Sequence, residues 1–440
     1  MNFSTDTGAL RAHISREGEE RITWADKPMD SSWYGMTAGE LIAESPSIER
    51  FSTPVMTLDA NALVTNTELM RLWCREHGVS LAPHGKTTMA PVLWLAQLEA
   101  GAWGITVANE SQLRVARGVG ISRIILGNQF IRPDGLAWLS RELDADPEFQ
   151  FICWVDSLDG VRLMDEALRA VGGRRPVQVC VEVGTVGGRT GARTLEQALD
   201  IARAVVASRV LELSGTCGYE GGAGGRAIDA EVLGGIDSFL RLMVQVHSAI
   251  DAWIESDEAI LTAGGSTFFD RVAEILAPEA RGREERRPTR VIVRSGGYII
   301  HDDGMYRVTT PSTRDAGPQF TPSMHVWSRV ISIPEPGIAL LDAGRRDVPY
   351  DVGLPEVQLV RRHDGDLVTT RALTDCTVYD LNDQHAFVRI PADSTLAVGD
   401  VVRLGLSHPC TAFDKWRIIP VIDDSNAKDP RLVGLVRTYF

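Results

Sequence analysis

The sequence lacks two features that would point to a membrane or to nucleic acid: a long hydrophobic run and an excess of basic charge. Its 440 residues carry a formal net charge of −14. A chain this acidic is a poor partner for nucleic acid or for an anionic membrane surface. A membrane-spanning helix needs about 20 apolar residues in a row, and no run in the chain approaches that length. We therefore expect neither partner.

Cysteine is also scarce, with six residues and no Cys-x-x-Cys pair. Several of them lie in apolar, strand-like runs, so we expect buried free thiols in a reducing compartment rather than disulfides. The first 20 residues are polar and include acidic side chains, unlike a signal or transit peptide. These features predict a cytoplasmic protein. With 44% apolar residues, the chain is long enough for two or more globular domains.

From residue 54 onward, strand-like and helix-like segments alternate. The first strand is expected at 54–58, and a helix that Asp59 caps and Gly78 ends follows it. Further strands are expected at 79–83, 103–108, 123–127, 151–155, 177–183, 211–215, 259–264 and 290–296. Most are continuous apolar runs, typical of strands buried on both faces. Eight such strands with helices between them predict an α/β fold, a TIM-type (β/α)8 barrel, with a doubly wound open sheet as the alternative.

The rest of the chain divides around this barrel. We expect the barrel domain to cover residues 51–310 and residues 1–50 to form an irregular N-terminal extension packed on the body. The charged stretch 277–290 is predicted to be a solvated loop before the last barrel strand. Beyond residue 310, short segments separated by turn residues predict a C-terminal all-β domain over 311–440.

Two glycine pairs follow the last two barrel strands, at Gly264–Gly265 and Gly296–Gly297. The loops after strands seven and eight of TIM barrels often bind phosphate. Glycine lets backbone N–H groups approach an anion closely, and Ser266 and Thr267 add hydroxyl donors. One such pair alone is typical of an ordinary turn. Two pairs at the two expected positions favour a phosphate site.

Lys86 follows the first barrel strand and is expected at the same end of the barrel as these loops. A lysine near a bound phosphate suggests pyridoxal phosphate held as a Schiff base. That chemistry needs an amine whose pKa is lowered by partial desolvation. A solvent-exposed lysine is the usual alternative, and it is the position of Lys86 that argues against it.

Four further residues are candidates at the barrel mouth or beside it. Arg189 is expected to reach the cofactor ring oxygen or a substrate carboxylate, and the phenol of Tyr219 the pyridine nitrogen. A surface arginine and a structural tyrosine are equally compatible with those two stretches. His408 and Cys410, two residues apart, face one way if extended, and imidazole and thiolate are good zinc ligands. Core packing is the alternative. Two protein ligands would leave open positions, as a catalytic Lewis acid needs.

Several segments together resemble the D-serine dehydratase and D-threonine aldolase family, whose members are pyridoxal phosphate enzymes of the alanine-racemase (fold type III) architecture. They are TPVMTLDANAL, PHGKT, VEVGTVGGRTG, GGST, SGGY, LLDAGRRDV, DQHAF and HPCTAFDKW. The resemblance runs from about residue 50 to the C-terminus. It places the strand at 54–58 with the β domain, and it implies a homodimer with the active site at the dimer interface.

The resemblance also implies a role for most of the candidate residues. Lys86 matches the Schiff-base lysine, Tyr219 the tyrosine near the cofactor ring, and His408 and Cys410 the metal pair. The phosphate-binding positions are matched by Ser266, Thr267, Gly296, Gly297 and Tyr298. Two positions depart from the family: Glu182 stands where Asp is common, and Tyr-Glu-Gly-Gly at 219–222 lacks a histidine that often follows the glycine. The sequence assigns no role to His84.

The function that this implies is a pyridoxal phosphate and metal dependent dehydratase acting on a small D-amino acid. Members with His-x-Cys resemble dehydratases, whereas the aldolases more often have His-x-Asp. The expected reaction converts D-serine or a related β-hydroxy D-amino acid to a 2-oxo acid and ammonia, with zinc as the expected divalent metal. The alternatives are a D-threonine-type retro-aldol cleavage to glycine and an aldehyde, a racemase, and a non-catalytic pyridoxal phosphate-binding protein.

Overall fold

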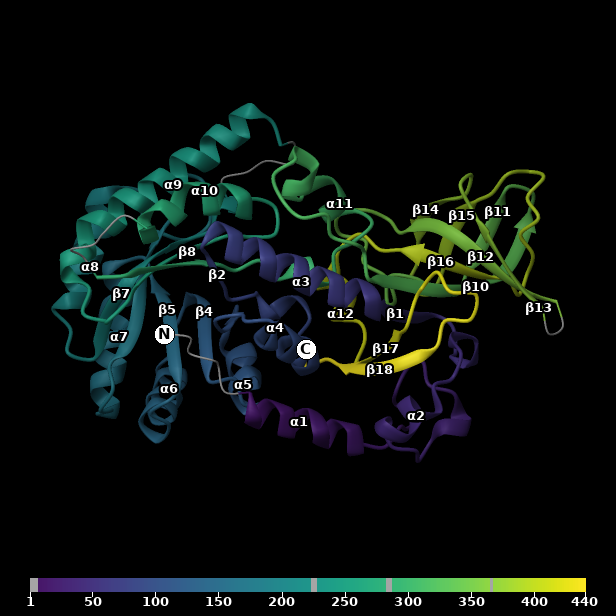
Figure 1. Cartoon of the computed structure of the whole chain (residues 1–440), viewed down its shortest axis with the longest axis horizontal. Coiled ribbons are helices and arrows are strands. Elements are labelled where there is room, and N and C mark those ends of the chain that lie inside the picture. The colour runs from purple at the N-terminus through teal and green to yellow at the C-terminus, as the bar shows by residue number, and fades with distance from the viewer. Residues whose placement is uncertain (1–6, 223–227, 282–286, 365–366) are drawn as a thin grey trace.

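The computed structural model describes residues 7–222, 228–281, 287–364 and 367–440. It contains an eight-stranded parallel sheet surrounded by helices and a second, ten-stranded sheet that is mostly antiparallel. Figure 1 shows the first on the left and the second on the right, with helix α1 along the lower edge. Among the described residues, no helix is long and apolar enough to cross a membrane.

All eight predicted barrel strands are confirmed. They are β2 (Ser80–Leu81), β3 (Ile105–Val107), β4 (Arg123–Gln129), β5 (Gln150–Val155), β6 (Val177–Val183), β7 (Leu211–Gly218), β8 (Ala259–Ala263) and β9 (Thr289–Val293). Their order in the sheet is β2-β9-β8-β7-β6-β5-β4-β3, and every pairing is parallel. The strands are buried on both faces, which explains why they lack a period of two.

Backbone hydrogen bonds between the two end strands close the sheet into a barrel. The N–H of Trp103 donates to the carbonyl of Leu81 at 2.6 Å, and the N–H of Thr106 donates to that of Pro83 at 2.9 Å. His84 and Thr106 form the corresponding parallel bridge. Small and apolar side chains fill the interior, among them those of Ala82, Ile125, Ile152, Trp154, Cys180, Cys217, Ile260 and Ile292.

Helices follow most of the barrel strands. They are α4 (Pro91–Glu99), α5 (Glu110–Gly118), α6 (Pro133–Ala145), α7 (Leu158–Val171), α8 (Leu195–Val206), α9 (Ala230–Ile250) and α10 (Phe269–Arg281), and α3 (Ala60–His77) precedes β2. As predicted, the Asp59 carboxylate caps α3 by accepting from the N–H of Ala62, and Gly78 ends it in the left-handed conformation. All six cysteines are free, as expected.

The prediction of a loop over 277–290 was wrong at its start. Helix α10 continues to residue 281 and accommodates Pro278 in its last turn. Residues 282–286 lie outside the described part of the chain. The charged composition and the proline suggested a break, but the apolar face of the helix, which includes Leu276 and Ala277, remains buried against the core.

The second sheet has the strand order β13-β12-β16-β10-β1-β17-β18. Its bounds are β1 (Val55–Asp59), β10 (Met324–Glu335), β12 (Glu356–Asp364), β13 (Leu367–Ala372), β16 (Val401–Gly405), β17 (Ile418–Ile422) and β18 (Leu432–Arg437). A branch is formed by β11 (Ile338–Leu341), β14 (Thr377–Leu381) and β15 (Ala386–Arg389). Strand β1 pairs with β10 and β17, as the resemblance implied, so the residue range 51–310 includes one strand of this sheet.

The N-terminal extension is not irregular, contrary to expectation. It contains α1 (Gly8–Glu19) and α2 (Ala38–Glu44). A capping box between Thr37 and Glu40 begins α2. Leu10 is the one apolar side chain that helix α1 buries. The helix therefore shows almost no apolar periodicity in the sequence. The extension packs its side chains Ile22, Met29, Trp33, Leu41, Ile48 and Phe51 on the second sheet.

Trp327, in the middle of β10, provides a test of this packing. Its ring is buried in the cluster with the extension, and its Nε1–H donates to Thr57 Oγ1 of β1 at 2.9 Å. Thr57→Val leaves that donor buried without an acceptor, which should lower the free energy of unfolding by about 1–3 kcal/mol. Urea denaturation measures the change. Thr65→Val, at an exposed position of α3, is the matched control, and an equal shift in both variants would contradict the prediction.

A candidate active site at the barrel mouth

Lys86 lies in a short 3₁₀ turn (Gly85–Thr87) just after β2, at the carboxyl end of the barrel. Its side chain is half-buried. Its charge acts on the imidazole of His84 and on the thiol of Cys410. The turn is tight because Gly85 leaves no room for a side chain: a Cβ there would lie 2.9 Å from both Ile105 and the ring of Trp94. Packing against the barrel wall therefore fixes the position of the backbone from which the Lys86 side chain extends.

The two glycine loops lie beside this turn and are hydrogen-bonded to each other. A Cβ on Gly296 would lie 2.3 Å from the carbonyl oxygen of His84, so only glycine fits there. The N–H of Gly297 donates to Ser266 Oγ at 3.2 Å, and Ser295 Oγ donates to the carbonyl of Gly265 at 2.9 Å. The predicted phosphate positions Gly265, Ser266, Gly296 and Gly297 thus form one cluster of backbone and hydroxyl groups.

Two contacts limit what individual members of this cluster offer to an anion. The buried Glu220 carboxylate accepts from the N–H groups of Gly264 and Gly265, at 2.8 and 2.6 Å, so the donor of Gly265 is already occupied. The hydroxyl of Tyr298 accepts from Gln97 Nε2 at 3.1 Å, and both side chains are buried. The Tyr298 phenol is therefore engaged with α4, and its backbone is the part that belongs to the loop.

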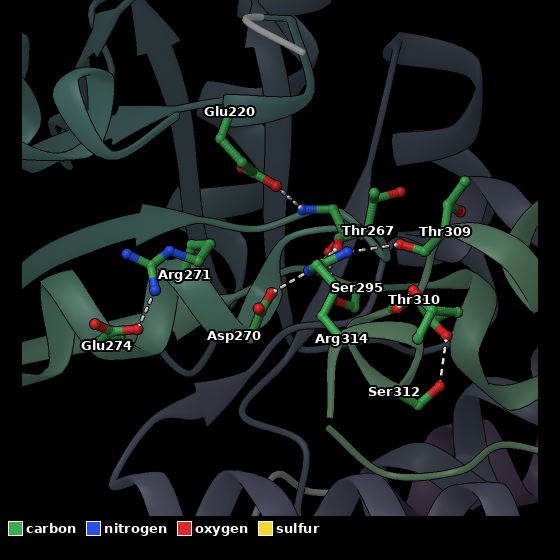
Figure 2. Close-up of polar contacts among 12 residues, drawn as sticks. Glu220, Thr267, Asp270, Arg271, Glu274, Ser295, Thr309, Thr310, Ser312 and Arg314 are labelled. Atoms are coloured by element: carbon green, nitrogen blue, oxygen red, sulfur yellow. Dashed lines mark hydrogen bonds and ion pairs between the residues drawn. The ribbon is translucent and has the colours of Figure 1, made fainter. Parts of the chain in front are cut away.

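Thr267 is held from outside the barrel by Arg314. This guanidinium donates to the carbonyl of Thr267 at 2.8 Å and to that of Thr309 at 3.2 Å, and it pairs with Asp270 at 3.0 Å (Figure 2). The loop after β8 is thereby tied to the segment that leads into the second domain.

Arg189 and Tyr219 come together at the mouth, where the guanidinium lies 4.7 Å from the centre of the tyrosine ring. Burial is the main cause that raises the pKa of Tyr219, so its phenol stays protonated near neutral pH. Arg193 holds the loop of Arg189 by donating to four carbonyls within it. Burial likewise raises the pKa of Glu182, which accepts from Gln129 and Thr190 at 2.6 and 3.0 Å.

Arg294, at the end of β9, is a residue that the sequence argument missed. It is 6% exposed, and it donates to Thr262 Oγ1 at 2.7 Å and to the carbonyl of Gly218 at 2.6 Å. Its charge acts on Glu220, Glu182 and the imidazole of His84. A fixed positive charge therefore lies inside the mouth, below the glycine loops. In the sequence, the only indication of such a role for Arg294 is its position directly before Ser-Gly-Gly-Tyr.

His408 and Cys410 come from the second sheet's side and meet the Lys86 turn. They begin helix α12 (Pro409–Phe413), after β16. Cys410 Sγ lies 3.6 Å from Thr87 Oγ1, and the thiol is hydrogen-bonded to His408. The other side of the imidazole is occupied, since its Nδ1 lies 2.6 Å from Asp351 Oδ2. Asp351 was also missed, because 57 residues separate it from its partner.

The charges of this pair follow from its contacts. Burial opposes protonation of His408, but Cys410 and Asp351 outweigh burial and raise its pKa to about 9. Burial alone would raise the pKa of Cys410, yet its hydrogen bond to His408 and the charges of His408 and Lys86 bring it below the usual value. Without a metal these shifts favour an imidazolium beside a thiolate. The thiolate and the neutral imidazole are the forms that bind zinc.

Tyr306 and Asp302 complete the mouth and were also missed. The phenol of the half-buried Tyr306 is hydrogen-bonded to Ser266, and a Cβ on Gly297 would lie 2.4 Å from its ring. Asp302 accepts from the N–H groups of Gly304 and Tyr306, at 2.8 and 3.0 Å, and burial raises its pKa to about 7. Both lie in helix α11 (Met305–Thr309) or just before it, a few residues beyond the second glycine pair.

The described residues fit a phosphate and a metal with open positions. Gly296 and Gly297 pack so closely on His84 and Tyr306 that neither position admits a side chain, which leaves their backbone and the hydroxyls of Ser266 and Tyr306 as the groups beside an anion. In the described part of the chain, no three His, Cys, Asp or Glu side chains are grouped to hold a metal ion. A metal on His408 and Cys410 would therefore keep coordination positions for other ligands.

Two protein-family models match separate parts of the chain. Residues 58–254 match the model of the alanine racemase N-terminal domain, and residues 323–422 match the putative serine dehydratase domain. The expected resemblance to the D-serine dehydratase and D-threonine aldolase family, with its alanine-racemase architecture, is therefore confirmed.

Two curated relatives span nearly the whole chain. The chain is 25% identical to a D-threonine aldolase of Arthrobacter sp over 384 residues, covering 87% of this chain and 92% of that protein. It is 23% identical to a 3-hydroxy-D-aspartate aldolase of Paracoccus denitrificans (strain Pd 1222), covering 88% and 94%.

Solved structures have the same fold. The D-threonine aldolase from Filomicrobium marinum gives a TM-score of 0.71 at 21% identity and covers 89% of this chain and 97% of that one. The D-threo-3-hydroxyaspartate dehydratase from Delftia sp. HT23 gives 0.67 at 19% identity, covering 88% and 98%.

The imidazolium–thiolate pair predicts selective alkylation of Cys410 in metal-free protein. The thiolate is the nucleophile, so iodoacetamide should modify Cys410 at pH 7 well before the five buried thiols, whose pKa values are raised by burial. Mass spectrometry of the peptides measures the rates. His408→Gln removes the stabilising charge and should move the reaction midpoint to higher pH. A midpoint at or above 9 in the parent protein would contradict the assignment.

Proposed function

Because the chain joins an alanine racemase N-terminal domain to a putative serine dehydratase domain, we propose that it is a pyridoxal phosphate and metal dependent lyase of β-hydroxy D-amino acids. One observation carries the proposal: the Lys86 turn lies between the glycine loops and the His408–Cys410 pair. An amine, the predicted phosphate loops and two candidate metal ligands are therefore neighbours at the barrel mouth.

Each residue has a part that follows from its position. The cradle at Ser266, Gly296 and Gly297 would hold the phosphate, and Lys86 would hold the cofactor aldehyde. Bound pyridoxal phosphate supplies an electron sink for charge that develops on the amino acid Cα. The Lys86 amine would also be the group that accepts the Cα proton. Arg294, buried below the loops, supplies a fixed positive charge.

His408 and Cys410 would hold the metal, for which zinc fits the donor set. A metal at an open site acts as a Lewis acid and makes a β-hydroxyl a better leaving group. Asp351 fixes the ring orientation of His408 through Nδ1, which leaves Nε2 for the metal. The imidazolium of His408 would lose its Nε2 proton as the metal binds, so metal binding should release a proton.

Dehydration is the reaction that we propose, with D-serine or a related β-hydroxy D-amino acid as substrate and a 2-oxo acid and ammonia as products. The support is Cys410 in the His-x-Cys arrangement. The comparisons include an aldolase and a dehydratase by name, so retro-aldol cleavage to glycine and an aldehyde is the second candidate. The N–H groups and hydroxyls around Lys86 would serve both dehydration and retro-aldol cleavage. The two reactions would differ in the part that the metal on His408 and Cys410 plays.

Lys86→Arg tests the amine. It keeps the positive charge but cannot bond covalently to the cofactor aldehyde, so the visible absorption band that borohydride fixes to Lys86 should be absent. Turnover should fall by about 10²–10⁴-fold, as expected for loss of a general base. Absorption spectroscopy and peptide mapping after reduction are the measurements. Lys415→Arg is the control, at a lysine of the second domain that pairs with Asp414, and borohydride labelling at any site other than Lys86 would refute this role.

Product analysis separates dehydration from cleavage. With D-serine and D-threonine we expect pyruvate or 2-oxobutanoate with equimolar ammonia, and chelation should abolish both because the leaving hydroxyl then has no Lewis acid. Chromatography of the products is the measurement. Glycine and acetaldehyde from D-threonine would establish the aldolase reaction instead. Products unaffected by a chelator, in protein shown to be metal-free, would exclude this role for His408 and Cys410.

A further inference from the structure

A second cavity lies at the opposite end of the barrel from Lys86. Its volume is about 1520 Å³, and it is lined by residues at the starts of the barrel strands, including Ser80, Arg123, Gln150 and Arg290. In parallel barrels the chemistry is found at the other end, where the strands stop. This cavity is therefore separate from the candidate active site, and nothing in the proposed reaction uses it.

The charge of the cavity is opposite to that of the protein. Six arginines and four carboxylates line it, whereas the whole chain carries −14. The arginines come from α1, α3 and the barrel strands or the loops before them, so elements far apart in the sequence bring positive charge to one place. A pocket of this sign in an acidic protein attracts anions.

Arg123 is the centre of this charge. It is 9% exposed, and its Nε and Nη1 donate to Gln150 Oε1 at 2.7 Å and to the carbonyl of Trp103 at 2.9 Å. Both partners are neutral, and among the described residues no carboxylate pairs with it. Burial, followed by the nearby charge of Arg290, disfavours its protonated form, and the carboxylate of Glu258, which is ion-paired with Arg290, offsets only part of this effect. A buried charge without a counter-ion in direct contact is costly, and an anion in the cavity would relieve that cost.

Two further features suit a ligand. Ser214 is 1% exposed and lines the cavity, and its hydroxyl has no hydrogen-bond partner among the described residues, which is unusual for a buried polar group. Phe151 and Ile152 add apolar wall, and the ring of Trp103 lies 4.8 Å from the Arg123 guanidinium. The surface thus offers a buried cation, a free hydroxyl and apolar contact.

We propose that this cavity is a second binding site, for a small organic oxyanion that bears a phosphate or carboxylate group. Arg123 would bind the charged group together with Arg290, whose Nε also donates to Glu258 Oε2 at 2.5 Å, and Ser214 would donate to it. The N-terminal extension forms part of the wall with Thr7 and Arg11, and Arg11 is ion-paired with Glu99 of α4. This gives the extension a purpose that the proposed reaction does not require.

The site also touches the candidate active site from below. Tyr298 lines the cavity, and its backbone directly follows Gly297 of the phosphate loop. Its hydroxyl is hydrogen-bonded to Gln97, which lines the cavity as well. A ligand here therefore contacts a side chain whose own backbone forms the cradle at the other end.

Calorimetric titration of the full-length protein with inorganic phosphate and with citrate tests the proposal. The protein is first saturated with pyridoxal phosphate, which fills the glycine-loop cradle if that cradle binds it. We expect at least one of the two anions to bind, and Arg123→Gln to weaken that binding by about tenfold or more. Ser214→Ala should weaken it by a smaller factor without removing a charge. Comparing the two anions shows whether phosphate or carboxylate is preferred.

The control is Arg162→Gln, at an exposed arginine of α7 paired with Asp159 and Glu166, which should bind as the parent does. Circular dichroism verifies that each variant is folded. If Arg123→Gln does not fold, Ser214→Ala still tests the proposed site. Binding that survives both cavity substitutions, or no binding of either anion to the parent protein, would overturn the proposal. Neither result depends on the lyase reaction, so the two proposals fail separately.

Discussion

The candidate site depends on the backbone hydrogen bonds that residues 81–84 make on both sides. Ala82 and His84 donate to the carbonyls of Val293 and Arg294 on one side, and Leu81 and Pro83 accept from β3 on the other. These bonds close the barrel. They also hold the Lys86 turn against the loop of Gly296, whose lack of a side chain permits the contact. His84, to which the sequence assigned no role, thus serves through its main chain at the seam.

Around this seam the protein pairs its buried and half-buried charges locally. Arg294 donates to a threonine and a carbonyl, Glu220 accepts from two backbone N–H groups, and His408 is paired with Asp351 and Cys410. Buried charges that are hydrogen-bonded in this way are held in one geometry. The site therefore has its electrostatic field in place before any ligand arrives, a condition for efficient catalysis.

The sequence was sufficient for the elements that bury apolar side chains on a regular period. All eight barrel strands and the capped helix α3 were predicted because continuous apolar runs and local caps mark them. Helix α1 was missed because it buries a single apolar residue, and the end of α10 because charge and Pro278 obscured it.

The same difference separates the site residues that were predicted from those that were not. Lys86, the glycine pairs and the His408–Cys410 pair are marked by short local patterns. Asp351 meets His408 only through the fold, and the carboxylate of Glu220 reaches Gly264 across 44 residues. Such partners are adjacent in space and distant along the chain, so no local pattern reveals them.

The position of β1 has a consequence for how the chain is made. Val55 pairs with Trp327, so the whole barrel is synthesised between the two strands. Until residues 324–436 leave the ribosome, β1 and the apolar side chains of the extension have no sheet to pack on. The newly made N-terminus must stay unpaired while the barrel forms beside it. Exposed apolar segments of this kind are where aggregation begins and where chaperones act.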